Sequence, residues 1–357
     1  MEAYQFLDNI GKGSFAKVYK VLRKADQKVF VAKEMEYGRM GEKEKQQLVN
    51  EVNILRELKH PNIIKYYDRI VDKQTQKLYI IMEYCEGGDL AQFLKKLKKD
   101  KEYLPEESVW KIFSQIVQAL CEIHKRQNKI LHRDIKPANI FLDKTVKLGD
   151  FGLARMLNIN SEFAHTQVGT PYYMSPELIE DHKYNEKSDI WACGCLLYEM
   201  CSLQPPFQAQ NYLALAMKIK QAQYENIPQQ YTTEMKRVIS WCLSVNQDQR
   251  PSVDDLLNLP RISIRLREKR LKENSLLLQQ REEDLKKKQQ YLIEYEQKLK
   301  ELDTQRNKEN VQNWQKGYKK NSDRSENSLT TDQDSDYKES TLEKLIQCRR
   351  SFQFKQQ

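Results

Sequence analysis

The stretch that decides the fold is "LHRDIKPANIFLDKTVKLGDFGLAR", residues 131–155. Two short apolar strips, Ile140–Leu142 and Val146–Leu148, stand between clusters of polar residues. We expect the strips to pair as a β-hairpin, because a polar turn separates two runs of strand-forming residues. Such a hairpin returns Asp150 to the neighbourhood of Asn139. The spacing therefore predicts that polar residues on both sides of the hairpin share one site.

The polar residues of this stretch fit one kind of chemistry. Asp134 is the candidate carboxylate that accepts a hydrogen bond from a nucleophilic hydroxyl. Lys136 follows it closely and is placed to neutralise charge on a group being transferred. Asn139 and Asp150 offer hard oxygen ligands of the kind that Mg²⁺ prefers when it bridges phosphates. The stretch therefore predicts a magnesium-assisted transfer of a phosphoryl group to a hydroxyl.

Upstream, "IGKGSFAKV" at residues 10–18 reads as a glycine-rich loop between two strands. Gly11 and Gly13 allow backbone N–H groups to approach an anion closely. Ala16 stands at the third position of the GxGxxG pattern, and the loop leads into another strand. A dinucleotide-binding fold needs a strand-to-helix crossover at this point, and the Walker A pattern is absent, so both alternatives are disfavoured.

Lys33 ends an apolar run in "VFVAKEM", and Glu51 lies close to the apolar face of the next predicted helix. A lysine at the end of a strand often only extends its ammonium to water. An inward-facing glutamate without a partner is costly, however, and the two residues neutralise each other if both point inward. The lysine then keeps spare donors for phosphate oxygens.

The periodicity of the chain predicts two lobes. Strand-like runs begin at residues 4, 18 and 29, then a helix follows with its apolar face on Leu48, Val52, Leu55 and Leu58, and two more strands follow. After Asp89 the pattern becomes helical, with an amphipathic segment at 107–124 and an almost wholly apolar one at 188–203. We expect an α+β fold in which a small antiparallel lobe precedes a larger helical lobe.

These motifs, in this order, resemble those of the eukaryotic protein kinases. The Gly-rich loop, Val31-Ala32-Lys33 for VAIK, the helix-αC glutamate, HRDxxxxN at 132–139, DFG at 150–152 and Ser175-Pro176-Glu177 for APE are all present. The resemblance covers about Tyr4 to Ile262 and implies a bilobal kinase fold that uses ATP with Mg²⁺, or Mn²⁺ as an alternative. Lys136 together with "GTPYYMSPE" is similar to the serine/threonine branch.

The resemblance also implies roles for individual residues. Catalytic roles fall on Asp134, Lys136, Lys33 and Glu51, and metal ligation on Asn139 and Asp150. The implied ATP site comprises Ile10, Gly11, Lys12, Gly13, Ser14, Phe15, Ala16, Val18, Ala32, Lys33, Met82, Glu83, Cys85 and Phe141. Within it, Ala32 is expected beside the adenine ring, Met82 as the gatekeeper residue, and the backbone from Glu83 to Cys85 as the hinge. Leu55, Tyr66, His132 and Phe151 are expected to stack as a spine that links the lobes.

Regulation is expected in the segment 153–174. Arg133 precedes the candidate catalytic aspartate, and a buried arginine needs a counter-charge that a phosphate on this segment supplies. Thr166 is the best candidate for that phosphate, whereas Thr170 is expected to hydrogen-bond near Asp134. Glu177 and Arg250 are expected to form an ion pair that anchors the segment.

Within the kinases the chain is similar to the NIMA-related (never-in-mitosis-A) family, especially its centrosomal or basal-body members. The strings that carry this resemblance are "ELKHPNII", "YYDRIVD", "LYIIMEYCEGGDL", "HRDIKPANIF", "KLGDFGLAR" and "VGTPYYMSPELI". It implies protein substrates, a role in the cell cycle, centrosome or cilium, and candidate contacts with microtubules or centrosomes.

The C-terminal third differs in character from the rest. Leucine recurs every seventh residue from Leu271 to Leu299, which predicts a coiled coil over 263–302 and a homodimer. The positions between the leucines are polar, so a solvated single helix is the alternative. We expect residues 303–340 to be a disordered linker and 341–357 a short separate segment. Lys308-Glu309-Asn310 resembles a KEN degradation signal, but in so polar a tail we interpret it as a chance match.

Composition limits the remaining possibilities. The net charge is +9, and about two thirds of it falls in residues 261–357, which argues against nucleic acid as the main ligand of the globular part. The 7 cysteines have no paired spacing, which is typical of reduced thiols. With no leader at 1–5 and no long apolar run, we expect a cytoplasmic protein, with no membrane contact, at the centrosome, basal body or cytoskeleton.

Two other classes of function are alternatives to an active kinase. A scaffold would bind nucleotide without transferring phosphate, but the complete set of catalytic groups disfavours it. A microtubule-associated protein would act through the basic tail alone, and microtubule binding by residues 261–357 would test that alternative.

Overall fold

The computed structural model describes residues 1–12, 16–38, 41–151 and 171–322. The predicted site residues outside these ranges are Gly13, Ser14, Phe15, Thr166 and Thr170. The chain divides into two compact units, Met1–Leu271 and Lys272–Gln357, and each is described by itself.

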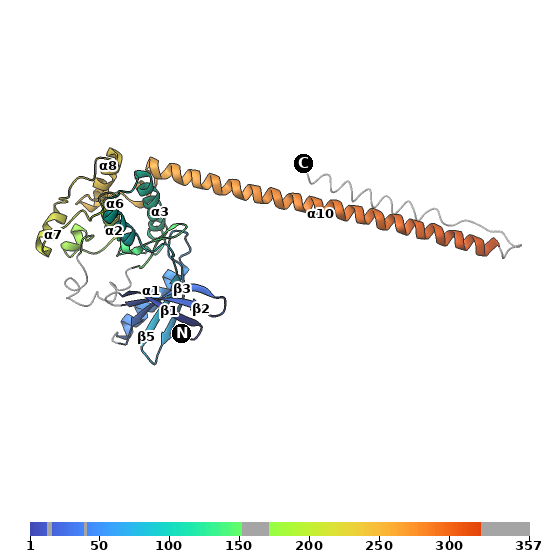
Figure 1. Ribbon diagram of the computed structural model, residues 1–357, viewed down its shortest axis with the longest axis horizontal. Coiled ribbons are helices and arrows are strands. Elements are labelled where there is room, and N and C mark those ends of the chain that lie inside the picture. Colours follow the sequence, from blue (N-terminus) through green and yellow to red (C-terminus); the bar gives the residue numbers. More distant parts are fainter. Residues whose placement is uncertain (13–15, 39–40, 152–170, 323–357) are drawn as a thin grey trace. The chain divides into compact units, whose positions relative to one another are not determined.

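The first unit begins with the expected antiparallel sheet, drawn in blue in Figure 1, whose strand order is β1-β2-β3-β5-β4. Its strands and one helix are β1 (Tyr4–Lys12), β2 (Ala16–Arg23), β3 (Lys28–Glu36), α1 (Glu42–Glu57), β4 (Tyr66–Asp72) and β5 (Lys77–Glu83). The predicted order of three strands, a helix and two strands is therefore confirmed.

Alternation along β3 divides the sheet's side chains between two faces. Cross-strand partners share a face, so Val31 lies with Met82 of β5, and Ala32 lies with Ile81 on the other side. Val31 belongs to the large hydrophobic core that continues into the helical lobe. Ala32 belongs to a separate small cluster on the opposite face. This division matters for the site described below.

The helical lobe follows β5. Its elements in the described residues are α2 (Leu90–Asp100), α3 (Glu106–His124), η1 (Pro137–Asn139), β6 (Ile140–Leu142), β7 (Val146–Leu148), α5 (Pro176–Ile179), α6 (Glu186–Ser202), α7 (Tyr212–Lys220), α8 (Thr233–Cys242), η2 (Gln247–Gln249) and α9 (Val253–Leu257). The hairpin predicted from the apolar strips is present as β6 and β7, paired antiparallel.

Helix α6 is the centre of this lobe, and nearly all of its residues are buried, as its apolar sequence predicts. Gly194 permits the close approach of α8, because a Cβ there would lie 2.7 Å from the Cβ of Cys242. An added methyl group in so tight a contact would force the two helices apart. The lobe is thus built around one helix that other helices cover.

The last helix, α10, spans Pro260–Ser322. Its beginning belongs to the first unit: Ile262 is fully buried, Leu266 packs against the core, and Arg265 forms an ion pair with Glu107 of α3. From Lys272 to residue 316, the last whose exposure is described, every side chain is exposed. None of the helices among the described residues is long and apolar enough to cross a membrane.

The extent of α10 corrects one expectation. The sequence predicts a disordered linker from residue 303, but residues 303–322 continue the helix. Residues 303–316 contain neither glycine nor proline, the two residues that are least favourable inside a helix. Polarity alone therefore did not distinguish a solvated helix from a disordered segment.

Candidate active site

The first part of the site is the pair formed by Lys33 and Asp150. Lys33 lies on β3 with its side chain only 7% exposed, and its Nζ donates to Oδ1 of Asp150. Asp150 follows β7 and adopts a left-handed backbone with φ of 54°. The ion pair thus connects the sheet to the stretch that opened the sequence analysis. Glu51, predicted as the partner of Lys33, lies in α1, but its side chain is outside the described set.

The second part is a cluster around the carboxylate of Asp134. Its Oδ2 accepts hydrogen bonds from Nζ of Lys136 at 2.8 Å and from Nδ2 of Asn139 at 2.8 Å. The same Nδ2 also donates to the backbone oxygen of Asp134 at 2.7 Å. The three residues predicted to act together are therefore in direct contact, and the carboxylate is held in one orientation.

The hairpin joins the two parts, as predicted. Strands β6 and β7 pair over their whole length, and the N–H of Gly149 donates to the backbone oxygen of Asn139 at 3.0 Å. Asp150 is the next residue, so its carboxylate follows directly from this contact. The sequence spacing of Asn139 and Asp150 is thus converted into proximity by a short hairpin.

The residues present fit a divalent cation with a preference for oxygen. Because both donor contacts of the Asn139 amide use Nδ2, its Oδ1 is the atom left to act as a ligand. Asp150 supplies a carboxylate whose side chain is 37% exposed. One amide oxygen and one carboxylate are a donor set that suits Mg²⁺, which keeps several waters.

A buried carboxylate that sequence reasoning missed holds this loop in place. Asp189, at the start of α6, is fully buried and accepts from the backbone N–H of His132 at 2.9 Å and of Arg133 at 3.0 Å. Nε2 of His124 lies 2.9 Å from the same carboxylate, and the hydroxyl of Tyr184 also donates to it.

The electrostatics of Asp189 are set by these donors. Burial by itself raises the pKa of the carboxyl, but the contacts with His124 and Tyr184 outweigh it and leave the pKa below its ordinary value. The charge therefore persists in the core. The sequence did contain a sign of this role. Asp189 lies near the start of an otherwise apolar helix, where a buried charge without a partner is costly.

The predicted spine is present as packed rings. The ring of Phe151 lies 4.7 Å from that of His132 and 6.4 Å from that of Tyr66, measured between centroids. Leu55 and these three residues are all buried. Nε2 of His132 lies 3.1 Å from the backbone oxygen of Gly149, and burial lowers the pKa of this histidine. A neutral His132 thus packs on Phe151, next to Asp150.

The predicted adenine contact of Ala32 needs correction. Lys33 pairs across the sheet with Val18, whereas Ala32 pairs with Tyr19 and lies on the opposite face. In the family pattern VAIK the alanine stands two residues before the lysine. In this chain Val31 stands two residues before Lys33, and Ala32 stands only one before it. Matching the letters Val-Ala therefore placed the prediction one residue too late. Since side chains alternate along a strand, Val31 occupies the face of Lys33. Val31, and not Ala32, is therefore the residue that lies beside Lys33 on the same face of the sheet.

The other predicted ATP-site residues are distributed along the sheet edge and hinge. Met82 lies opposite Val31 and is buried, and Cys85 is buried with its thiol pKa raised to about 12 by burial. The carboxylate of Glu83 pairs with Lys147 at 3.0 Å, and the backbone N–H of Glu83 donates to the backbone oxygen of Lys65 at 2.9 Å. The remaining described members, at intermediate or full exposure, are Ile10, Gly11, Lys12, Ala16, Val18 and Phe141.

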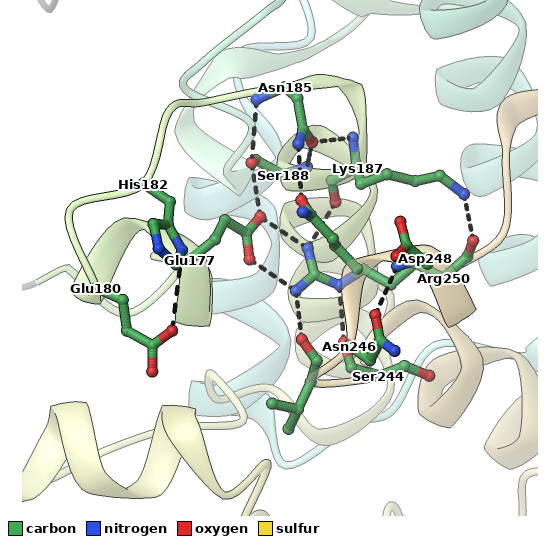
Figure 2. A network of polar contacts seen from close by, with 12 residues as sticks. Glu177, Glu180, His182, Asn185, Lys187, Ser188, Ser244, Asn246, Asp248 and Arg250 are labelled. Atoms are coloured by element: carbon green, nitrogen blue, oxygen red, sulfur yellow. Dashed lines mark hydrogen bonds and ion pairs between the residues drawn. The ribbon is translucent and has the colours of Figure 1, made fainter.

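The expected ion pair of Glu177 and Arg250 is also present. Nη2 of Arg250 lies 2.7 Å from Oε2 of Glu177, and Nη1 donates to Oε1 at 2.8 Å. Figure 2 shows the guanidinium facing the carboxylate, with the hydroxyl of Ser188 donating to the same carboxylate at 2.7 Å. Arg250 also lies over the ring of Trp191 at 4.9 Å. These contacts lower the pKa of Glu177 to about 2, although burial alone would raise it.

Comparison with known proteins agrees with this geometry. The protein kinase domain family model matches residues 4–262. The chain is 53% identical over 289 residues to a probable serine/threonine-protein kinase nek2 of Dictyostelium discoideum, covering 80% of this chain and 69% of the relative.

Two further relatives agree with the first. Serine/threonine-protein kinase Nek2 of Homo sapiens is 53% identical over 73% of this chain, which spans 60% of the relative's length. The G2-specific protein kinase nimA of Emericella nidulans is 44% identical over 79% of this chain and 44% of its own length. A protein kinase domain implies protein substrates, ATP and a divalent metal, generally Mg²⁺. The chain therefore belongs to the NIMA-related family of serine/threonine protein kinases.

Proposed function

We propose that this chain is an active kinase that transfers the γ-phosphoryl group of ATP to serine and threonine hydroxyls of proteins. The observation that carries the proposal is the direct contact of Asp134 with Lys136 and Asn139, close to the Lys33–Asp150 pair. A chain that only bound nucleotide would have no use for the oriented carboxylate of Asp134.

In the proposed mechanism Asp134 orients the substrate hydroxyl. Two donors hold its Oδ2, so the other oxygen accepts the hydrogen bond of the incoming hydroxyl and aims an oxygen lone pair at the phosphorus. Lys136, with its side chain 44% exposed, turns from Asp134 to the phosphoryl oxygens as charge develops there. Both groups work by position, because the reaction asks little covalent chemistry of the protein.

The nucleotide side of the site rests on three residues. Lys33 neutralises phosphate oxygens, and Asn139 and Asp150 hold Mg²⁺, or Mn²⁺ as an alternative with the same preference for oxygen ligands. When bound, the cation neutralises the charge of the polyphosphate. We assign the adenine contact to Val31, together with Val18 and the hinge backbone from Glu83 to Cys85.

Two substitutions test the transfer reaction. Asp134→Ala is expected to lower kcat by about 10²–10⁴-fold, since it removes the group that orients the hydroxyl. Lys33→Met is expected to abolish transfer as well, while both variants retain the unfolding midpoint of the parent. The readout is incorporation of γ-phosphate into a serine and threonine peptide array. Unchanged transfer by either variant would refute the proposal.

The proposed switch is phosphorylation of Thr166, whose phosphate would pair with Arg133. The support is that Arg133, which adopts a left-handed backbone with φ of 67°, is only partly exposed and immediately precedes Asp134. Thr170 is proposed to hydrogen-bond near Asp134. Mass spectrometry of the active enzyme and the activity of Thr166→Ala test this; full activity without the phosphate contradicts it.

The proposed partner of α10 is a second copy of this chain. In the second unit Leu278, Leu285 and Leu292 are between 57% and 60% exposed, at the seven-residue spacing of a coiled coil. We place the kinase domain at 4–262 and the dimer contact within 263–302. Dimerisation would raise the local concentration of one activation segment near another active site. Sedimentation of the full chain as a monomer at micromolar concentration would exclude it.

The proposed setting is the cell cycle, at the centrosome, basal body or cytoskeleton. The support is the name of the Emericella relative, a G2-specific protein kinase, together with the resemblance to centrosomal members of the family. Imaging of a fluorescent fusion through a synchronised cell cycle tests this, and an even distribution at every stage contradicts it.

A further inference from the structure

Helix α2 presents a basic face that the reaction described above does not use. Its sequence is LAQFLKKLKKD, with Leu90 and Leu94 buried and Lys95, Lys96, Lys98 and Lys99 all exposed. Lys101 follows at the C-cap and is also exposed. Among the described residues, none of these lysines lies within ion-pair distance of a carboxylate.

Stabilisation of the helix end explains only part of this positive charge. Lys98 and Lys99 lie in the last turn, where positive charge favours the carboxyl end of a helix. Lys95 and Lys96 lie before that turn and gain little from it. Four like charges on one exposed face repel each other, so the face loses stability unless an anion covers it.

The basic face lies on an element that supports the active site. Helix α2 packs against η1, which contains Asn139, and against β6. At its start, Gly88 accepts a hydrogen bond from the N–H of Leu142 at 2.9 Å, and Asp89 caps the helix by accepting from the N–H of Gln92 at 2.9 Å. A ligand held on α2 is therefore bound to a helix that itself packs against the element carrying Asn139.

A second observation concerns the charge of Lys98 and the carboxyl of Glu199 in α6. Glu199 of α6 is hydrogen-bonded to the hydroxyl of Tyr173, which lies within the segment 153–174 expected to be regulatory. Burial raises the pKa of Glu199, while Tyr173 and the positive charge of Lys98 lower it. Lys98 is thus within electrostatic range of this region.

We propose that the exposed face of α2 is a docking surface for an acidic segment of the protein substrate, at a distance from the phosphorylated residue. This inference rests on the proposed kinase function. From Lys95 to Lys101 the helix and its C-cap rise by about 9 Å, which an extended peptide of about three residues spans. Two or three aspartates or glutamates in that length would supply carboxylates to several of the ammonium groups.

The same chemistry favours a peptide over a nucleic acid. The face carries lysines and no arginine, so it lacks the planar fork that pairs with phosphates in two places. Nucleic-acid surfaces also follow the backbone over a longer groove with stacking aromatics. A convex face of one short helix suits a short segment of separate carboxylates.

The decisive variant is the full chain carrying Lys95→Glu and Lys96→Glu. Its matched control carries Lys24→Glu and Lys73→Glu, which change the charge equally on residues of the sheet lobe. The probes are the best array peptide alone, the same peptide joined through a Gly-Ser linker to Asp-Glu-Asp-Asp-Glu, and that peptide with the acidic residues replaced by glutamine and asparagine.

We expect the Lys95/Lys96 variant to raise KM for the acidic peptide about five- to tenfold, since exposed charge pairs are individually weak. The kcat value, and the KM for the two other peptides, are expected to stay unchanged, as is every value for the control variant. Added salt is expected to remove the advantage of the acidic peptide. An equal change for all peptides, or no change for any, would overturn the proposal.

A binding measurement separates failure of this inference from failure of the proposed function. Fluorescence anisotropy of a labelled Asp-Glu-Asp-Asp-Glu peptide needs no catalysis. Binding that Lys95→Glu and Lys96→Glu abolish supports the docking surface even if no peptide is phosphorylated. Retention of labelled poly(U) through these lysines without binding of the acidic peptide would show a nucleic-acid surface and overturn the proposal.

Discussion

The helical lobe and the exposed part of α10 use the same charged residue types in opposite ways. In the lobe, Arg250 and Glu177 are almost fully buried, and the guanidinium also donates to the backbone oxygens of Ser244 and Lys187. In the second unit the charged side chains from Lys272 to residue 316 are exposed, and the apolar ones lie among them. The buried charges of the first region have partners within the lobe, whereas the leucines of the second region are exposed.

The difference shows which charged residues affect the stability of the fold. A buried ion pair is weak evidence of net stability, but removing one of its members leaves an uncompensated charge in the core. An exposed charge is solvated, and its loss changes little. Replacing one exposed charged residue of α10 should therefore change the stability little. Replacing one buried charged residue of the lobe should destabilise the fold.

The largest effect expected from this contrast is that of Arg250→Met. The substitution leaves the carboxylate of Glu177 buried and is expected to lower the free energy of unfolding by about 3–5 kcal/mol. Urea unfolding followed by the fluorescence of Trp191 and the other tryptophans measures it. The exposed pair of Arg261 and Glu234, 3.4 Å apart, supplies the control.

Arg261→Met is expected to cost less than about 1 kcal/mol. Replacing both buried members, as Glu177→Leu with Arg250→Met, is expected to recover part of the loss because no charge is then left alone. If Arg250→Met and Arg261→Met lowered the free energy of unfolding equally, the contrast between buried and exposed charges would be wrong.

The next effect is acid sensitivity from Glu177. Its folded pKa of about 2 lies below its ordinary value of 4.5, so its stabilisation is complete above pH 4.5 and is lost as the pH falls towards 2. The difference corresponds to about 3 kcal/mol. Unfolding free energies measured between pH 5 and pH 2 should fall less steeply in Glu177→Gln. The exposed Glu225→Gln should keep the parental slope, and an unchanged slope in both would contradict the assignment.

Much of the fold and site followed from local sequence pattern. The hairpin and the cluster at Asp134 were predicted because spacing and the cost of unpaired charge act over short distances. The pair of Glu177 and Arg250, which are 73 residues apart, was expected only from the resemblance to protein kinases. The error at Ala32 came from matching letters to a motif. Strand alternation, a physical rule, would have placed Val31 on the face of Lys33.

What could not be predicted depends on tertiary partners. Asp189 is recognised only when α6 meets the backbone of His132 and Arg133, residues far from it in the sequence. The choice between helix and disorder in residues 303–322 turns on helix propensity that composition alone did not weigh. The predicted partner of Lys33, Glu51, stays a prediction.

A smaller effect tests where the lobe ends. A chain that ends at Ile262 lacks the packing of Leu266 and the ion pair of Arg265 with Glu107, whereas a chain that ends at Leu271 keeps them. The shorter form is expected to be less stable by about 1–3 kcal/mol, mainly from lost apolar burial. Thermal unfolding of the two forms measures this. Equal stability would show that the first turns of α10 do not belong to the lobe.

The smallest effect on unfolding is expected at the exposed leucines of α10, where the contrast between the two regions is sharpest. Leu285→Asn changes a side chain that is 60% exposed, so the kinase lobe should lose less than about 0.5 kcal/mol. Its effect should instead appear as a lower dimer fraction in sedimentation equilibrium, because an asparagine replaces one of the leucines proposed to contact the second copy. Leu213→Asn, at a leucine of α7 that is 74% exposed, is the control and should change neither quantity. If Leu285→Asn lowered the stability of the lobe and left the oligomeric state unchanged, the leucines would serve the folding of this chain rather than contact with another copy.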